Sequence, residues 1–239
     1  MIEDRVYQNF KDNIVSQSNS LLLAISGGVD SIVMLDIIHK LKEKYNIISN
    51  IFLVFINYKL NENSNSREKI CLKLSKKYGY PLILKKSYLS SKNFESNARN
   101  ERYRYFSKIL LNKDIDFVLT AHHKDDQIET LLMKYYDNSD WISYLGIRDK
   151  YNQIIRPMLD IQKDEILYYA QDNKLLWIDD PSNKDINFRR NKMRHIILPD
   201  IYRNNPGLID DLMKLHSNAK IKFRKILNKI STYEKDYIY

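Results

Sequence analysis

The sequence predicts an α/β protein with an open, mostly parallel sheet that carries helices on both faces, followed by a short all-helical C-terminal extension. Short apolar runs alternate with segments of helical periodicity over the first two-thirds of the 239-residue chain. Polar or glycine-rich segments follow several of these runs, as expected where strands end at a ligand-binding edge. From Pro206 onward, apolar residues recur at three- and four-residue spacing, which is typical of an amphipathic helix.

The two kinds of pattern give the order of the expected elements. Strands are expected at residues 21–26, 50–57, 81–86 and 116–123. Helices are expected at residues 29–45, 66–79, 94–113, 125–136 and 161–174, and a further helical segment at 187–202 should end at Pro199. Residues 142–147 and 152–159 are expected to connect elements, the second as a candidate edge strand, and 177–185 to form a loop. We expect one domain at 1–205 and an extension of one or two helices at 206–239.

Composition restricts the partners and the compartment. The 39 Lys and Arg residues exceed the 30 Asp and Glu residues by nine, which favours a polyanion such as nucleic acid, although a lysine-rich composition bias explains the excess equally well. The single cysteine, Cys71, excludes an intramolecular disulfide and a Cys-rich metal site, and its helical surroundings predict a buried, structural thiol. With no signal peptide and no apolar run of about 18 residues, we expect a cytoplasmic protein without a membrane partner.

A glycine-containing loop joins the first expected strand to the first expected helix. It comprises Ser26, Gly27, Gly28, Val29, Asp30 and Ser31. The two glycines allow a sharp turn and close approach to an anion, and the N–H groups that open the helix point to the same place. Asp30 suits a phosphate loop if it holds Mg²⁺ or orders the loop. An ordinary strand–helix turn is the alternative. The spacing of the glycines matches neither a Walker loop nor a dinucleotide fingerprint.

A second polar segment follows the fourth expected strand and opens a helix. It contains His122, His123, Asp125, Asp126 and Glu129. The three acids can face one side of the helix start, where acidic residues also commonly stabilise the helix dipole. At the carboxyl end of a strand, such a group can bind Mg²⁺, or hold and deprotonate an amine.

The chain resembles the tRNA(Ile)-lysidine synthases of the PP-loop N-type ATP pyrophosphatase superfamily. The motifs that carry the resemblance run in the family's order from about residue 20 to about residue 200. They are S-G-G-V-D-S at 26–31, H-H-K-D-D-Q-I-E-T at 122–130, Glu95 with Arg99, Arg102 and Tyr103, R-P-M-L at 156–159, D-P-S-N at 180–183, and Arg190-Asn191 with Arg194-His195. The resemblance implies an adenine nucleotide alpha hydrolase-like fold of the PP-loop type.

The resemblance also implies an activity and its substrates. These are ATP, with Mg²⁺, free L-lysine and a tRNA(Ile) with a CAU anticodon. Residues 26–31 would bind ATP, with Asp30 at the Mg²⁺, and Asp30, Asp125, Asp126 and Glu129 would be catalytic. The residues expected to contact lysine or RNA are His122, His123, Glu95, Arg99, Arg102, Arg190 and Arg194. Solvated ion-pair faces are the alternative for the arginine-bearing helices. The oligomeric state is left open, with a homodimer as one alternative.

Two departures from the family and three rival functions remain. Tyr58 stands where the family has a histidine, so any role of that histidine is in doubt, although a tyrosine could stack on a base. Only about 35 residues follow Pro206, whereas many family members carry further C-terminal domains. The rivals are a tRNA 2-thiolation enzyme, which a single helical cysteine disfavours, an ATP pyrophosphatase for small molecules, and a non-catalytic RNA-binding protein.

Overall fold

The computed structural model describes residues 1–14, 19–58, 63–88 and 94–236, the side chains at 63, 94–95, 184 and 231–236 excepted. The chain divides into two compact units, each built from two segments. Unit 1 comprises Met1–Lys124 and Asp149–Pro181, and unit 2 comprises Asp125–Arg148 and Ser182–Tyr239. The boundary expected near residue 205 falls inside unit 2, because the helix that follows it belongs to the same unit as the helices before it.

Unit 1 contains a six-stranded sheet in the order β3-β2-β1-β4-β6-β5. Its strands are β1 (Asn19–Ala24), β2 (Ile48–Asn57), β3 (Leu82–Lys86), β4 (Phe117–Leu119), β5 (Lys150–Tyr151) and β6 (Ile154–Ile155). All neighbours pair in parallel except β5 and β6, so the mostly parallel sheet is confirmed. The candidate edge strand at 152–159 forms β6 instead, one place inside the edge, and β5 is the edge strand.

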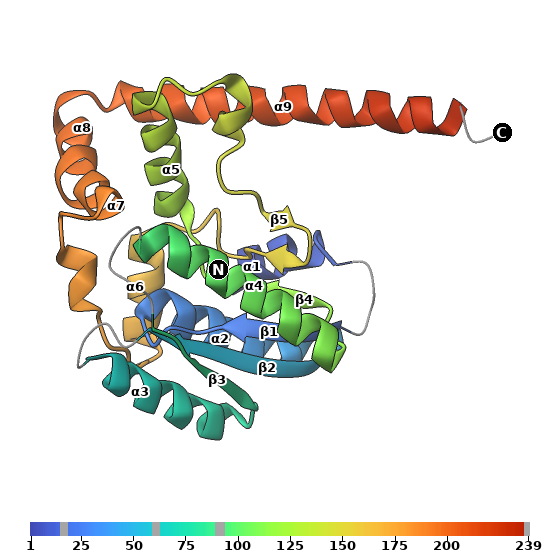
Figure 1. Ribbon diagram of the computed structural model, residues 1–239, viewed down its shortest axis with the longest axis vertical. Coiled ribbons are helices and arrows are strands. Elements are labelled where there is room, and N and C mark those ends of the chain that lie inside the picture. The colour runs from blue at the N-terminus through green and yellow to red at the C-terminus, as the bar shows by residue number, and fades with distance from the viewer. Residues whose placement is uncertain (15–18, 59–62, 89–93, 237–239) are drawn as a thin grey trace. The chain divides into compact units, whose positions relative to one another are not determined.

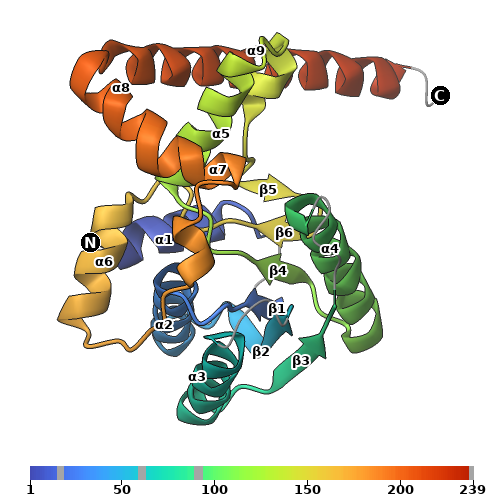
Figure 2. The same cartoon turned by 60° about the vertical axis from the view of Figure 1, so that its left-hand side comes forward.

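The helices of unit 1 lie on both faces of this sheet, as expected. They are α1 (Ile2–Lys11), α2 (Val29–Lys44), α3 (Asn63–Tyr78), α4 (Phe94–Lys113) and α6 (Lys163–Asp172). Figure 2 shows α4 on one side of the strands and α2 and α3 on the other. The two buried apolar clusters of unit 1 show the same arrangement. Phe106, Ile109 and Leu110 of α4 pack on one face of the sheet, and residues of α1, α2, α3 and α6 pack together on the other.

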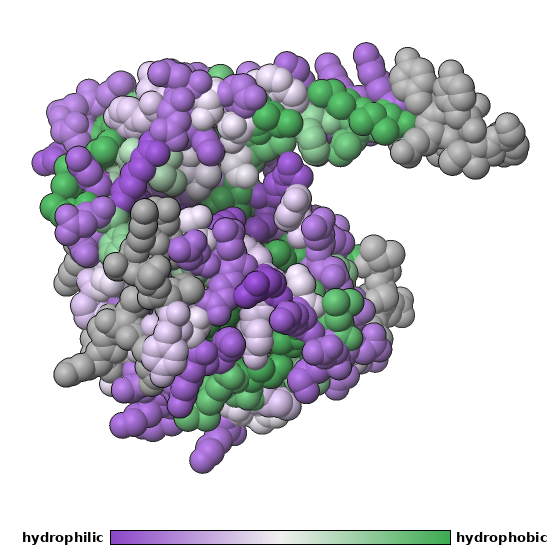
Figure 3. Space-filling model, viewed as in Figure 1, coloured by the Kyte–Doolittle hydropathy of each residue, from purple (hydrophilic) through white to green (hydrophobic). Residues whose placement is uncertain are grey.

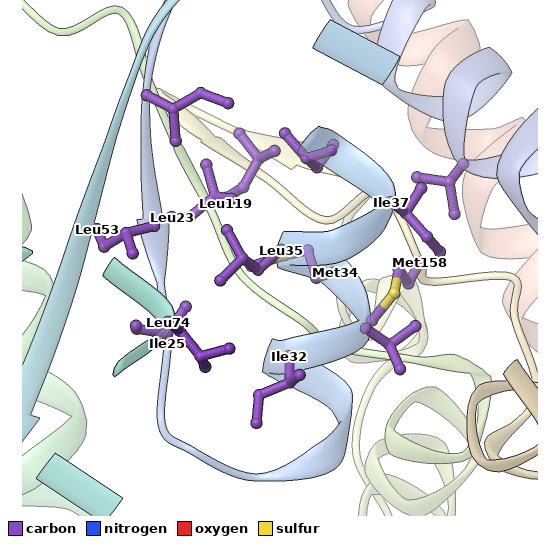
Figure 4. Packing of buried hydrophobic residues seen from close by; sticks show 14 of the residues in the cluster. Leu23, Ile25, Ile32, Met34, Leu35, Ile37, Leu53, Leu74, Leu119 and Met158 are labelled. Atoms are coloured by element: carbon purple, nitrogen blue, oxygen red, sulfur yellow. The ribbon is translucent and has the colours of Figure 1, made fainter. Parts of the chain in front are cut away.

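The larger cluster is built where β1, β2 and β4 face α2. Leu23 pairs in register with Leu53 and with Leu119, and all three side chains are fully buried. Figure 4 shows these leucines pointing toward Leu35 and the other apolar residues of α2. Because both faces of a parallel sheet are covered, its central strands are apolar along their length. This explains the apolar run of β1, which predicts a strand from the sequence alone.

Unit 2 is helical within the part of the chain described. It contains α5 (Lys124–Tyr136, from its second residue), the 3-10 helix η1 (Trp141–Leu145), α7 (Arg189–Lys192), the π-helix η3 (Met193–Ile197), α8 (Leu198–Asn204) and α9 (Gly207–Asp236). The helical C-terminal region is confirmed, and α9 is one helix (Figure 1). The expected stop at Pro199 is wrong. Proline lies in the first turn of α8, where the missing N–H costs little, so the chain remains helical to Asn204.

The apolar stripe of α9 is covered only over its first half. Leu212 and Ala219 are buried in unit 2, whereas Ile226, Leu227 and Ile230 are exposed. Figure 3 shows apolar side chains gathered on the second half of this helix. Among the helices described, none is long and apolar enough to cross a lipid bilayer.

Candidate active site

The loop between β1 and α2 takes the form that its glycines predict. Gly27 has φ +79°, a left-handed conformation that favours glycine. A Cβ atom there would lie 3.0 Å from Ile70 Cγ2 and 3.1 Å from Arg67 Cβ, both on α3. Gly28 precedes the first residue of α2, so the N–H groups that open this helix follow the turn directly. Gly27 is therefore required both by its backbone conformation and by the closeness of α3.

Ser26 and Ser31 hold the loop closed. The Ser31 hydroxyl accepts a hydrogen bond from Ser26 N at 3.0 Å and donates one to Gly28 O at 2.9 Å. Because its only hydrogen is used on Gly28 O, the 3.1 Å contact between the two hydroxyls must be a bond donated by Ser26. Gly28 N in turn donates to Ser26 Oγ at 3.3 Å. The two serines thus fix the shape of the loop.

Asp30, in the first turn of α2, lies beside two cationic or ionisable side chains. Lys163 at the start of α6 forms an ion pair with Asp30 Oδ1. His123 Nε2 lies 4.0 Å from the same oxygen and is almost fully buried. The structure therefore brings together the predicted residues Asp30 and His123, and adds Lys163. Lys163 was not predicted as a site residue from the sequence. The feature that could have indicated it is a lysine close to the start of a predicted helix, where acids are favoured.

The other side of the loop is held by residues from α3 and from the segment before Pro181. Arg67 Nη1 lies 2.5 Å from Asp180 Oδ2, and both side chains are largely buried. Ile178 N donates to Gly27 O at 3.0 Å. The D-P-S-N motif thus begins with a carboxylate that is ion-paired to the arginine packed against Gly27. Arg67 was also missed from the sequence, because nothing in its own segment marks it.

Unit 2 contains a compact cluster of acids and arginines. Glu129 is fully buried, and its carboxylate accepts bonds from Arg190 Nε at 2.8 Å and from Arg194 Nε at 2.5 Å. Asp126 Oδ1 accepts from Arg190 Nη2 at 3.0 Å and from Arg194 Nη2 at 3.1 Å. The expectation that Asp126 and Glu129 share a helix face is met, and the two arginines of the R-N-x-x-R-H motif contact both of them. With two charges of each sign, the cluster is formally neutral.

Three of the remaining predicted residues, Asp125, His122 and Arg99, have contacts with other side chains. Asp125 lies near Tyr202 of α8, whose pKa is raised first by burial and then by this carboxylate. His122 is hydrogen-bonded through Nδ1 to Thr120 Oγ1 at 3.0 Å. Arg99 is exposed on α4, 5.0 Å from the ring centroid of Tyr103. The side chain of Glu95 lies outside the residues described.

Tyr58, the residue that departs from the family pattern, packs against α4. Its hydroxyl donates to Ala98 O at 3.0 Å. Burial raises the pKa of Tyr58, and the positive charge of Arg102 acts in the opposite direction. The predicted residue Arg102 therefore lies next to Tyr58, and the tyrosine hydroxyl links the residue that follows β2 to α4.

The arrangement around the loop suits a triphosphate better than a protein-bound metal. Among the described residues, no group of three or more His, Cys, Asp and Glu side chains could hold a metal ion. Mg²⁺ in nucleotide sites commonly needs only one or two carboxylates, because phosphate oxygens and water supply the other ligands. Asp30, an oxygen donor at the phosphate loop with a side chain 31% exposed, fits that requirement.

The fold and the loop define the class of this protein. Residues 1–201 match the PP-loop domain family, so the chain belongs to that family. Among solved structures it is similar in fold to a U34-tRNA thiolase, NcsA, from Methanococcus maripaludis with its [4Fe-4S] cluster. The TM-score is 0.75 at 16% identity, over 93% of this chain and 78% of the other.

Several curated relatives of the chain have names that state a function. The chain is 33% identical over 222 residues to a tRNA(Ile)-lysidine synthase of Persephonella marina, covering 90% of this chain and 49% of the relative. It is 30% identical over 227 residues to a tRNA(Ile)-lysidine synthase of Lactococcus lactis, covering 93% and 51% respectively. A bifunctional protein TilS/HprT of Listeria monocytogenes is 32% identical, with 93% and 36% covered. The chain thus spans about half the length, or less, of these relatives.

Proposed function

We propose that this chain carries the ligase activity of a tRNA(Ile)-lysidine synthase. The reaction joins L-lysine to carbon 2 of the wobble cytidine of a tRNA(Ile) with a CAU anticodon, and converts ATP to AMP and pyrophosphate. The observation that carries the proposal is the likeness to enzymes of that name, which extends over about nine-tenths of the chain. We place the reaction in the cytoplasm; a homodimer remains an untested prediction.

In the first step the phosphate loop would hold ATP while oxygen 2 of the cytidine attacks the α-phosphorus. The bond from the α-phosphorus to the bridging oxygen breaks, and pyrophosphate leaves with the electron pair. Loop N–H groups and the dipole of α2 stabilise the phosphates. Mg²⁺, held by Asp30 and the phosphates, would supply further positive charge. The resulting adenylated base has a good leaving group where it previously had a poor one.

In the second step the ε-amine of lysine would attack carbon 2, and AMP leaves. The amine must first lose a proton, which at neutral pH costs roughly 4 kcal/mol for an unperturbed pKa of about 10.4. A carboxylate of Asp125 or Asp126 would bind the ammonium group and then accept this proton. Glu129, fully buried and bound by Arg190 and Arg194, would position the group that contacts the amine.

The charge of α9 supports a polyanionic substrate. Between Leu212 and Lys229 this helix has no acidic residue, and its basic side chains are exposed there: Lys214, Lys220, Lys222, Arg224, Lys225 and Lys229. Exposed lysines and arginines bind a phosphate backbone by releasing its counterions, which makes the affinity fall with added salt. We therefore expect tRNA binding to weaken steeply with ionic strength.

Incorporation of labelled lysine into an unmodified tRNA(Ile) transcript with a CAU anticodon tests the proposal. We expect label to enter the tRNA only when ATP is present, with one AMP formed per lysine. A transcript with U in place of the wobble cytidine is the control and should remain unlabelled. Absence of label in the presence of tRNA-stimulated pyrophosphate release would contradict the lysine half of the proposal. Absence of both would favour a non-catalytic RNA-binding protein.

Paired variants on α5 test the roles of the two carboxylates. If Asp126 accepts the proton, Asp126→Asn should abolish lysine incorporation while tRNA binding and pyrophosphate release remain. Asp125→Asn is the matched comparison, one residue away on the same helix. Whichever variant loses only the second step identifies the base. Near-normal incorporation by both variants would rule out this role for either residue.

A further inference from the structure

The phosphate loop contains a negative charge and no positive one. Its side chains within residues 26–31 are two hydroxyls, one valine and the carboxylate of Asp30. A Walker loop carries a lysine for the β- and γ-phosphates, and that lysine is missing from this pattern. Cleavage of ATP between the α- and β-phosphorus puts new negative charge on the leaving pyrophosphate, and enzymes stabilise such charge with positioned cations. Any side-chain cation that assists Mg²⁺ at this loop must therefore come from elsewhere in the chain.

Lys163 is a cation that lies beside this loop. It lies 133 residues from Asp30 in the sequence and is ion-paired to it. Both side chains are 31% exposed, so the pair lies at the surface of unit 1 beside the start of α2 and is open to an incoming ligand. Because the ammonium group contacts the acid of the loop, it lies within the reach of a phosphate held by the same loop.

The backbone that carries Lys163 is fixed. Ile161, two residues earlier, is fully buried, and its carbonyl accepts from Lys124 N at 2.8 Å. Gln162 N, the residue before Lys163, donates to Glu165 Oε2 at 2.9 Å. Glu165 also binds Arg5 of α1, with 2.6 Å between Oε1 and Nη1. A lysine with a rigid backbone loses less conformational freedom on binding a phosphate, which favours a functional role.

The position of Lys163 is unfavourable for the helix itself. It is the first residue of α6, where the helix dipole presents positive charge and prefers acids. Asp164 and Glu165, the next two residues, follow that preference. A lysine at this point works against local stability, and residues that do so are commonly found at functional sites. Its ion pair with Asp30 explains how the cost is offset without a ligand.

We propose that Lys163 is the cation of the phosphate loop, which contacts the β-phosphate of bound ATP and stabilises the leaving pyrophosphate. Without nucleotide, Asp30 holds the ammonium group at the loop. When ATP binds, the phosphates replace Asp30 as the partner of Lys163, and Asp30 becomes available to the Mg²⁺ that accompanies ATP. Lys163 keeps its proton throughout, since the bridging oxygen leaves with the electron pair of the broken bond and needs only a positive neighbour. This inference rests on the ATP-using part of the proposed function and not on lysine transfer.

Binding of ATP and of AMP to the full chain, without tRNA or lysine, tests the role. Lys163→Met removes the charge but retains a long side chain, and should weaken ATP binding by about tenfold or more, as expected for loss of a charge-assisted bond. AMP has no β-phosphate, so its affinity should change much less than that of ATP. Lys163→Arg should recover most of the ATP affinity. Lys174→Met, which removes an exposed lysine just beyond the other end of α6, should behave like the unchanged protein.

A double-mutant cycle with Asp30 separates this role from a merely structural ion pair. If Lys163 contacts phosphate, Lys163→Met should still reduce ATP affinity in a chain that carries Asp30→Asn. A reduction that disappears in that background, equal losses for ATP and AMP, or no loss at all would overturn the proposal. Failure of lysine incorporation with the ATP and AMP results as expected would instead count against the proposed function alone.

Discussion

Arg194 binds Glu129 through both carboxylate oxygens, with Nε 2.5 Å from Oε1 and Nη2 3.0 Å from Oε2. The carboxylate is fully buried, whereas the arginine side chain is 34% exposed. A buried carboxylate is stable only when its oxygens accept hydrogen bonds, so Glu129 on α5 depends on this two-point contact with Arg194. The same guanidinium also contacts Asp126, so one side chain organises both acids.

Arg194→Met should therefore destabilise the protein. Loss of the two-point contact leaves a buried carboxylate with fewer partners, and we expect a fall of about 1–3 kcal/mol in the free energy of unfolding. Urea titration followed by circular dichroism measures this change. Arg194→Lys should recover only part of it, because a lysine cannot bind both oxygens in the plane of the carboxylate.

Arg189→Met is the matched control for that variant. Arg189 lies on α7, one residue before Arg190, and is paired with Asp137, but both side chains of the pair are well exposed. Exposed pairs contribute about 1 kcal/mol or less. Equal destabilisation by the two variants would show that burial of Glu129 does not determine the effect.

Gly27→Ala should damage the phosphate loop. The substitution puts a Cβ atom 3.0 Å from Ile70 Cγ2 at a residue with φ +79°, so crowding adds to backbone strain. We expect about 1–3 kcal/mol of lost stability together with weaker ATP binding. Gly79→Ala is the control, because Gly79 has φ +72° but no atom within 4 Å of the added Cβ. Thermal melting of the two variants separates strain from crowding, and a larger loss for Gly79→Ala would contradict the crowding argument.

Hydrophobic periodicity predicted most of the fold because it depends on each segment alone. The helix expected at 94–113 is found with the same limits in α4, and the strand at 50–57 differs from β2 by two residues at one end. The strand expected at 116–123 was too long, since β4 covers only Phe117–Leu119. The segment continues with Thr120, Ala121 and two histidines, but the pairs of β4 with both of its neighbours, β1 and β6, end at Leu119. Strand length is set by the partner strand, which a single segment cannot reveal.

The site was predictable where chemistry is local in sequence and not where it depends on distant partners. Asp126 and Glu129 are three residues apart, so their common helix face followed from spacing. The arginine partners of these acids lie 61 to 68 residues away in the sequence, so they could not be predicted from spacing. The contact of Lys163 with Asp30 likewise depends on tertiary structure. The roles assigned to Arg190 and Arg194 as RNA contacts remain predictions, and their ion pairs with acids limit how freely they could turn to a phosphate.

Cys71 should be unreactive in the folded protein. Burial raises the pKa of this thiol to about 12, although the charge of Arg67 acts in the opposite direction. Since the thiolate is the reactive form, labelling by a thiol reagent at about pH 8 should be very slow until denaturant is added. Labelling of the native chain at the rate of a free cysteine would contradict this. It would also support the rival function of a tRNA 2-thiolation enzyme, which requires an accessible sulfur nucleophile or cluster ligand.

A buried acid in the core of unit 1 should make stability depend on pH. Asp36, which is 7% exposed, accepts hydrogen bonds from Tyr78 at 2.6 Å and from Tyr169 at 2.8 Å. Burial alone would raise the pKa of Asp36, but these hydroxyls and the ammonium group of Lys40 outweigh it, so the pKa lies below its usual value. The unfolded chain then binds more protons than the folded one as the pH falls. The stabilisation is complete above the unfolded pKa of about 3.9 and is lost as the pH falls through the lower, folded value.

Tyr169→Phe and Tyr168→Phe provide a matched test of this network, since they are neighbours on α6 and Tyr168 is 72% exposed. Tyr169→Phe removes one bond to a charged carboxylate and should reduce the free energy of unfolding by about 1.5–3 kcal/mol at neutral pH, whereas Tyr168→Phe should have almost no effect. Because the deleted bond is made to ionised Asp36, the difference between the two variants should shrink below about pH 4. Urea unfolding at a series of pH values measures it. Because the Tyr169 hydroxyl also accepts a hydrogen bond from Lys40 Nζ at 2.7 Å, part of the difference should persist at low pH. A difference that is constant down to the folded pKa would show that the charge of Asp36 is not what the hydroxyl stabilises.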